Sequence, residues 1–212
     1  LGMDSTGQTL VGWSYSGLGK EAVAWNGEQL IHLGDFPGGP TDAYANACSN
    51  NNVVVGRGWD ENGATAFRWT HHEGMQLLGI SLIGQPAFNS EAYDINSEGS
   101  VIVGRGNMPD GSGAFVSTPV LGMRSLKSLL IDQGADVSGF QLIDVRAVSH
   151  EGLRFAGNCI ANGVITGYVA NLNPIISRVA GYVTLQDTVG SPAGQVVQVE
   201  FWQGGVLKGT SS

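Results

Sequence analysis

The sequence predicts an all-β protein in which four repeats of about 45–50 residues form propeller-type, four-stranded blades. Two observations lead to this prediction. A phrase of turn, apolar strand, hairpin and second strand recurs four times along the chain. The 212 residues also include 33 glycines, whereas only 13% are charged. Short strands joined by tight turns have this composition, and long surface helices do not. A solenoid of hairpins is the structural alternative.

One glycine anchors each repeat, and we call it the strand glycine. These are Gly12, Gly56, Gly104 and Gly157, which lie 44, 48 and 53 residues apart. Eleven positions after each stands a larger residue (Val23, Phe67, Phe115, Tyr168), preceded by a small one (Ala22, Ala66, Ala114, Gly167). Five positions before it, Gly7, Asn51, Gly99 or Gly152 marks a turn with left-handed backbone. The small residue next to the large one favours blades, because it lets a neighbouring sheet approach.

Each full repeat divides into strands a to d. We expect strand a at 43–48, 92–96 and 144–149, and strand c at 22–25, 64–70, 114–118 and 167–171. Strand b ends at the strand glycine in an apolar run such as 101–103, which predicts burial of both faces. Strand d is expected at 30–34, 75–79 and 122–126. Residues 60–63 and 109–113 are typical of hairpin turns, and 126–131 are predicted to contain a helical turn.

The repeats occupy residues 1–173, and the pattern changes at 174–212. There, 175–185 and 195–202 alternate like strands, and Gly204–Gly205 suggest a hairpin turn. Because 38 residues are too few for a full sandwich core, we expect a truncated β-sandwich domain. The first and fourth repeats are incomplete, so we expect a piece of a longer protein in which an upstream segment pairs with 167–171. Without that segment, this strand edge is expected to be open and to favour self-association.

Several phrases resemble the HAF repeats of bacterial extracellular proteins. They are Glu-Ala-Val-Ala-Trp at 21–25, Ala-Phe-Arg-Trp-Thr at 66–70 and Leu-Gly-Asp-Phe-Pro-Gly-Gly at 33–39. The Ala-Phe pair recurs at Ala114–Phe115, although the His of the name-giving motif is replaced in both places. The fourth repeat has no Trp and no Leu-Gly-Asp phrase. The resemblance covers 1–173 and implies an exported β-rich protein, extracellular or at the cell surface, with no catalytic residues.

Charge and cysteine content limit the partners and the chemistry. The formal net charge of −8 argues against nucleic acid and anionic membranes as partners, and no apolar run reaches the length of a membrane span. Cys48 and Cys159 occupy different positions in their repeats, so buried free thiols are expected, with a mutual disulfide left open.

Metal sites are not expected. Asp4, Glu98 and Glu151 lie in the turn between strands a and b of three different repeats. Each turn offers too few oxygens for Ca²⁺, so we interpret the three as turn residues. His71 and His72 are adjacent on a strand or turn and point to opposite sides, which disfavours one shared ion. We expect no cofactor, and no nucleophile or paired acid motif indicates an enzyme.

The candidate binding surface consists of residues that follow the strand glycines, near the b–c loops. These are Trp13, Tyr15, Arg57, Trp59, Asp60 and Arg105. Exposed aromatic and charged side chains can recognise carbohydrate or protein, whereas Trp25 and Trp69 are expected to pack within blades. The sequence therefore predicts a non-catalytic extracellular or cell-surface binding module. A propeller-type glycan hydrolase or lyase, and a purely structural spacer, are the alternatives.

Overall fold

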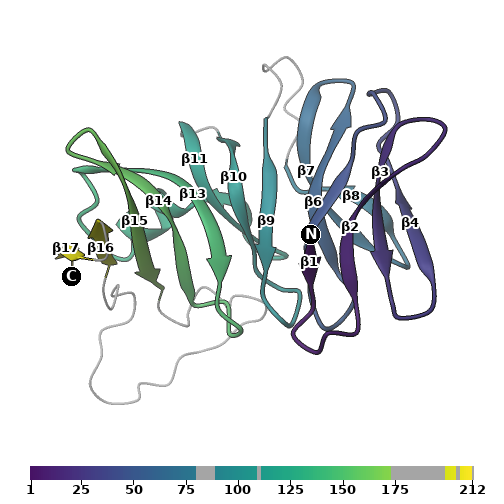
Figure 1. Cartoon of the computed structure of the whole chain (residues 1–212). Helices are drawn as coiled ribbons and strands as arrows, with labels where there is room; N and C mark the ends of the chain where they lie inside the picture. The colour runs from purple at the N-terminus through teal and green to yellow at the C-terminus, as the bar shows by residue number, and fades with distance from the viewer. Residues whose placement is uncertain (80–88, 109–110, 173–198, 204–205, 212) are drawn as a thin grey trace.

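The fold is all-β, with repeated four-stranded antiparallel sheets and one short helix (Figure 1). The computed structural model describes residues 1–79, 89–108, 111–172, 199–203 and 206–211. Sheet A has the order β1-β2-β3-β4, sheet B β5-β6-β7-β8, sheet C β9-β10-β11-β12 and sheet D β13-β14-β15-β16-β17. Each sheet is therefore a meander of consecutive strands, as the repeat predicts.

The bounds of the strands follow the expected a-to-d division. Sheet A contains β1 (Gly2–Met3), β2 (Leu10–Tyr15), β3 (Lys20–Trp25) and β4 (Leu30–Gly34). Sheet B contains β5 (Tyr44–Cys48), β6 (Val54–Asp60), β7 (Gly63–Thr70) and β8 (Gly74–Leu77). Sheet C contains β9 (Glu91–Ile95), β10 (Ile102–Met108), β11 (Gly111–Thr118) and β12 (Gly122–Ser125). Sheet D contains β13 (Phe140–Val148), β14 (Arg154–Ala161), β15 (Val164–Asn171), β16 (Val199–Gln203) and β17 (Val206–Ser211).

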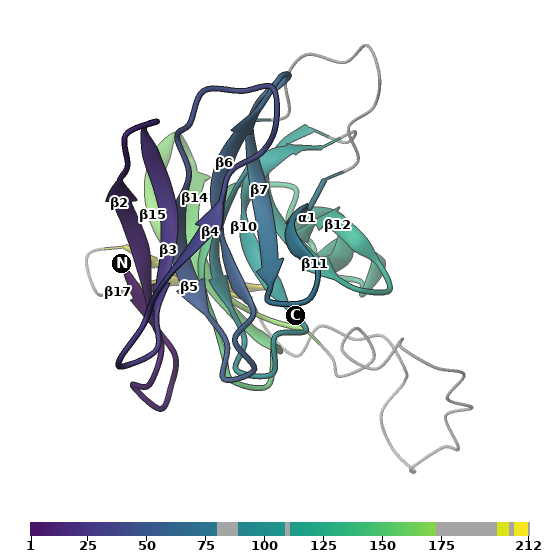
Figure 2. The same ribbon diagram turned by 90° about the vertical axis from the view of Figure 1, so that its right-hand side faces the viewer.

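The sheets stand face to face in chain order, from sheet A at one end to sheet D at the other (Figures 1 and 2). Strand b of each sheet packs on strand a of the next: β2 on β5, β6 on β9 and β10 on β13. The a strands β1, β5, β9 and β13 also lie next to one another in this order. Among the described strands, the arrangement is an open row of blades and not a closed ring.

The spacing of eleven residues is the register of the b–c hairpin. Each strand glycine lies directly opposite its large partner: Gly12 opposite Val23, Gly56 opposite Phe67, Gly104 opposite Phe115 and Gly157 opposite Tyr168. In sheet B, a Cβ at Gly56 would overlap the carbonyl oxygen of Tyr44 and lie 3.0 Å from the Phe67 ring. The glycine is therefore required because strand a and the aromatic ring occupy the space of a side chain.

Neighbouring sheets pack a large face on a small face. Phe67 and Trp69 of sheet B pack against Ala22 and Ala24 of sheet A in one cluster. The same arrangement joins Phe115 to Ala66 between sheets B and C, and Tyr168 to Ala114 between sheets C and D. Phe67 and Phe115 are 0% exposed, so each contributes about 1.5–3 kcal/mol through burial. The predicted role of the small residue is confirmed.

In sheet C, strand b is buried on both faces, as predicted. Val101, Ile102 and Val103 are 3%, 4% and 0% exposed. Because neighbouring strand residues point to opposite faces, sheets B and D must both cover this strand. Strand b of sheet A differs, since Leu10 is 47% exposed.

A polar side chain caps each turn between strands a and b. In each turn a side-chain oxygen accepts from a backbone N–H at or near the start of strand b. In sheets A and B, Thr9 donates to Asp4 Oδ1 (3.0 Å) and Val53 donates to Ser49 Oγ (3.2 Å). In sheets C and D, Val101 donates to Asn96 Oδ1 (2.8 Å) and Arg154 donates to Ser149 Oγ (3.1 Å). The turn interpretation of Asp4 is thereby confirmed. In the turns of sheets C and D, Asn96 and Ser149 accept from strand b. Glu151 also takes part in its turn, where hydrogen bonds from its own backbone N–H and from the Ser149 side chain lower the pKa of its carboxyl.

One predicted turn position is wrong. Gly7, Gly99 and Gly152 have the expected positive φ of 75–76°, but in sheet B the left-handed residue is Asn52 (φ 57°), and not Asn51. The cause is a turn one residue shorter: Ser49 N bonds Val53 O, whereas Asn96 N bonds Val101 O. Asn52 is therefore the structural counterpart of Gly99.

The predicted helical turn is confirmed as α1 (Leu126–Asp132). Ser125 caps its N-terminus, since its side chain accepts from the backbone N–H of Ser128. Leu126, Leu129 and Leu130 are buried in the cluster between sheets C and D. The helix thus covers the outer part of that interface.

Residues from the C-terminal segment extend sheet D. β16 pairs with β15, placing Trp202 opposite Gly167 and Val199 opposite Ala170, and β17 pairs with β16. The prediction that this edge of residues 167–171 stays open is therefore wrong. The expected strand at 175–185 and the turn at Gly204–Gly205 lie outside the described residues.

Both cysteines are free and buried. Burial raises the pKa of Cys48 to about 12, with the Asp4 charge adding to the effect, and raises that of Cys159 to about 11. Both thiols therefore stay protonated at neutral pH. Within the described chain, the helical part is too short and too polar to cross a membrane.

Candidate functional site

The residue after each strand glycine occupies one repeated place, and these residues form a row across the sheets. The row consists of Trp13, Arg57, Arg105 and Asn158. In three sheets this residue pairs with a polar residue of strand a: Arg57 with Tyr44, Arg105 with Glu91, and Asn158 with Asp144. One repeat position thus yields a continuous polar and aromatic surface, because each blade presents it at the same height.

In sheet A, two aromatic rings and a lysine form the first part of this surface. Trp13 and Tyr15 are 48% and 74% exposed, and their rings meet edge to face with centroids 5.4 Å apart. Lys20 Nζ lies 5.7 Å from the Trp13 ring centroid and 4.8 Å from that of Tyr44 in sheet B. Lys20 therefore joins the two sheets, while Asp42 holds its ammonium group at 2.7 Å.

Sheet B continues the surface with the same kind of pair. Arg57 lies over the ring of Trp59 at 5.3 Å, and its Nη1 donates to the Tyr44 hydroxyl at 3.3 Å. Arg57 also lies 3.9 Å from Glu91 of sheet C. Burial, with the Glu91 charge adding to it, raises the pKa of Tyr44, so its phenol remains a neutral hydrogen-bonding group.

We call this set the aromatic–cation ladder. It consists of Tyr15, Trp13, Lys20, Tyr44, Arg57 and Trp59. Two of its donors, Arg57 Nε and Trp59 Nε1, are buried and have no hydrogen-bond partner among the described residues. Unsatisfied buried donors are rare in native proteins, and a ligand or water molecule can satisfy them.

The ladder contains four of the six predicted site residues. Asp60 is not part of the ladder. Its Oδ1 accepts from the backbone N–H groups of Asn62 and Gly63, so it stabilises the b–c turn. Arg105 is exposed in the same row, one sheet further on. Lys20 and Tyr44 were missed, because neither follows a strand glycine.

A β-bulge recurs in strand a, and the bulged residues contact strand a of the neighbouring sheet. The register shifts at Asn46 in β5, Tyr93 in β9 and Arg146 in β13. Asn46 Nδ2 donates to Glu91 Oε1 (3.0 Å), and Arg146 lies 4.0 Å over the Tyr93 ring. Bulges redirect side chains in this way, and here they link strand a of one sheet to strand a of the next.

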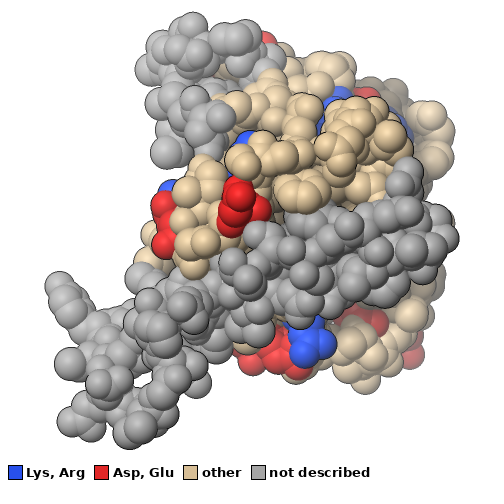
Figure 3. Space-filling model, turned by 90° about the vertical axis from the view of Figure 1, so that its left-hand side faces the viewer, with Lys and Arg blue, Asp and Glu red and all other residues tan. Residues whose placement is uncertain are grey.

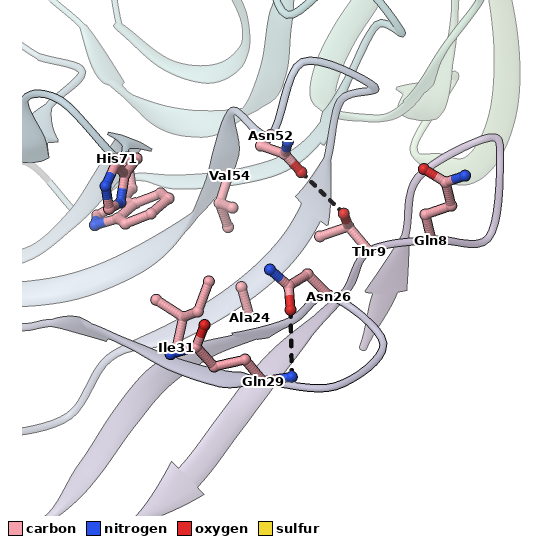
Figure 4. A pocket seen from close by; sticks show the side chains of 10 residues that line it. Gln8, Thr9, Ala24, Asn26, Gln29, Ile31, Asn52, Val54 and His71 are labelled. Atoms are coloured by element: carbon pink, nitrogen blue, oxygen red, sulfur yellow. Dashed lines mark hydrogen bonds between the residues drawn. The ribbon is translucent and has the colours of Figure 1, made fainter.

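A pocket of about 370 Å³ opens between sheets A and B at the other end of the same strands (Figure 4). Its floor is apolar and is formed by Ala24, Ile31, Val54 and Trp69. Its rim carries the four side-chain amides of Gln8, Asn26, Gln29 and Asn52. Thr9 and His71 complete the lining, and the His71 ring meets Trp69 edge-on at 6.4 Å.

Metal ligands do not gather in the described part of the chain, where no three His, Cys, Asp or Glu side chains are grouped for an ion. On the side seen from β17, charged side chains of the described residues lie in small groups on a largely uncharged surface (Figure 3).

Comparison with known proteins adds no family assignment. The chain matches no protein-family model, and a search of curated proteins finds no significant relative. The resemblance to HAF repeats therefore rests on the sequence phrases and on the repeated four-stranded sheets.

Proposed function

We propose that this chain is a non-catalytic binding module of an exported bacterial surface protein, and that it binds a carbohydrate chain along the aromatic–cation ladder. The observation that carries the proposal is the continuity of the ladder across two sheets, from Tyr15 to Trp59. Aromatic faces with adjacent hydrogen-bonding groups suit sugar rings, which are apolar on one face and rich in hydroxyls at the edge. A row repeated at blade spacing suits a ligand that is itself a repeating polymer.

The charges of the ladder support a ligand held by contact area and hydrogen bonds. Lys20 is paired with Asp42 and Arg57 lies near Glu91, so neither cation is left to neutralise a strongly anionic partner. The exported location is proposed from the HAF resemblance alone.

The alternative of a glycan-active enzyme needs two carboxylates placed to act as acid and base. Glu91 and Asp144 occupy matched positions, but both already accept hydrogen bonds. Asn46 donates to Glu91, while Asn158 and Arg146 donate to Asp144. These contacts favour a positioning role for both carboxylates and thus support the binding proposal.

The test is titration of the chain against a panel of soluble polysaccharides by calorimetry. We expect saturable binding that the Trp13→Ala/Tyr15→Ala variant weakens at least about tenfold, equal to about 1.4 kcal/mol. The control is Trp25→Ala, since Trp25 is 41% exposed on the opposite face of sheet A. Absence of binding to every polysaccharide, or equal loss in the control, would refute the proposal.

A further inference from the structure

The pocket between sheets A and B exists because one interface departs from the packing of the others. Between sheets B and C, Val53 packs on Gly99, where an added Cβ would lie 2.9 Å from the valine Cγ2. Between sheets C and D, Val101 packs on Gly152 in the same way. Between sheets A and B these places hold Thr9 and Asn52, whose side chains hydrogen-bond at 2.9 Å. A polar pair therefore replaces an apolar contact.

A second difference leaves room beside this polar pair. Ala24 lies on the pocket floor, while Arg68 and Val116 occupy its place in sheets B and C. The larger side chains of those sheets would reach into the space that Ala24 leaves. The interface between sheets A and B thus combines a smaller side chain, Ala24, with the polar Thr9–Asn52 pair, a combination that neither of the other two interfaces has.

The rim offers hydrogen-bonding groups that the described chain does not use. Asn26 Oδ1 accepts from the backbone N–H of Gln29 and Asn52 Oδ1 accepts from Thr9, but their Nδ2 groups have no partner within the described residues. The side-chain amides of Gln8 and Gln29 likewise have none there, and both are exposed. Each amide can donate and accept, which matches hydroxyl groups that do the same.

The lining also defines the charge and the size of a ligand. No Asp, Glu, Lys or Arg belongs to the lining, where His71 is the one residue that can carry a charge. A neutral ligand therefore suits this lining, because burying an unpaired charge is costly. The apolar floor, including Trp69, suits a ring with a C–H face. A volume of about 370 Å³ is near the lower end of small-molecule sites, about 300–1,000 Å³.

We propose that this pocket is a second binding site, separate from the ladder, and that it holds one neutral sugar residue. The amides of Gln8 and Gln29 bind hydroxyl groups at the rim, and the ring lies over Ala24 and Val54 toward Trp69. The site goes beyond the proposed function, because it lies at the opposite end of the strands and recognises a single residue and not a chain.

The experiment uses the whole chain and glucose, galactose, mannose and N-acetylglucosamine as neutral probes, with glucuronic and galacturonic acids as charged counterparts. Binding is measured by calorimetry and by saturation-transfer NMR. We expect at least one neutral sugar to bind saturably and the uronic acids to bind at least about tenfold more weakly.

Two variants remove the site by different means. Gln8→Ala/Gln29→Ala deletes two exposed amides, and Thr9→Val/Asn52→Gly installs the apolar pair of the other interfaces. Both are expected to weaken neutral-sugar binding at least about tenfold. Gln141→Ala, which changes an exposed glutamine of sheet D, should leave it unchanged.

The outcomes separate the two sites. Loss in the pocket variants alone supports the second site even if polysaccharide binding at the ladder fails. The inference is overturned if no neutral sugar binds, if uronic acids bind as tightly, or if the pocket variants bind like the wild-type chain.

Discussion

Sheets A and B contain the same repeat but experience different surroundings. In sheet B both faces are covered. Phe67, which pairs with the strand glycine, packs on sheet A and is 0% exposed. In sheet A only one face packs on a described neighbour. On the other face, Val23 is 9% exposed beside Leu10 and Trp25, at 47% and 41%. The b–c hairpin has the same register in the two sheets, so for its residues the difference lies in what each sheet packs against.

This comparison shows that the repeat determines hydrogen bonding, whereas the neighbouring sheet determines the energetic weight of each position. The strand glycine faces strand a in both sheets. In sheet B, backbone atoms of strand a occupy the space that a Cβ at Gly56 would need. At Gly12 the nearest atom to such a Cβ belongs to the Leu1 side chain, which is 99% exposed. Matched substitutions in sheets A and B therefore test the idea directly.

The largest effect is expected at the aromatic position. Phe67→Ala removes a fully buried ring from the A–B cluster, and we expect a loss of about 3–5 kcal/mol of unfolding free energy. Val23→Ala, the matched change in sheet A, should cost no more than about 2 kcal/mol because it removes only two carbons. Chemical denaturation of both variants measures the difference, and equal costs would contradict the role assigned to the neighbouring sheet.

A smaller but sharper contrast is expected at the strand glycine. Gly56→Ala places a Cβ against the Tyr44 carbonyl and the Phe67 ring, so we expect about 1–3 kcal/mol of destabilisation from overpacking. Gly12→Ala meets only the end of the exposed Leu1 side chain and should stay within about 0.5 kcal/mol. Thermal unfolding of the two variants distinguishes them, and a Gly12→Ala cost as large as that of Gly56→Ala would rule out this explanation.

Much of the fold could be predicted because the repeat aligns its residues across a hairpin. The eleven-residue spacing from Gly56 to Phe67 arises because the two residues pair across the hairpin. The small Ala66 and the large Phe67 alternate because they pack against different neighbouring sheets. Four of the six candidate site residues also come together, because they share repeat positions.

Other features had no signal of this kind. Asn51 and Asn52 have the same turn preference, so the shorter turn of sheet B was not visible. The bulges at Asn46, Tyr93 and Arg146 fall on residues of different chemistry, and pairing of β16 with β15 joins segments distant in sequence. The pocket depends on a missing side chain at Ala24, which no motif records.

The smallest expected effect concerns the caps of the a–b turns, where sheet A has a titratable Asp4 and sheet B a neutral Ser49. Burial would raise the pKa of Asp4, but hydrogen bonds from the Thr6 hydroxyl (2.5 Å) and the Thr9 backbone N–H (3.0 Å) outweigh it and hold this pKa below its usual range. A carboxyl whose folded-state pKa is lowered stabilises the fold above its unfolded pKa of about 3.9. That contribution is lost as pH falls through the folded-state value.

Asp4→Asn keeps a side-chain oxygen in the cap, as Asn96 provides in sheet C, but removes the titration. We therefore expect the stability of the wild type relative to Asp4→Asn to be constant from neutral pH to about pH 5 and to decline below about pH 4. Asp94, whose pKa burial raises despite hydrogen bonds from Val148 and Ile95, acts in the opposite direction, but it is present in both proteins and cancels in the difference.

Ser49→Ala in sheet B serves as the control: it should lower stability by about 0.5–2 kcal/mol relative to the wild type, as loss of a capping hydrogen bond does, and this difference should not depend on pH over this range. Urea denaturation between pH 3 and 7 measures all three proteins, and a relative stability of Asp4→Asn that does not change with pH would show that the Asp4 carboxyl is not held in its charged form by the turn.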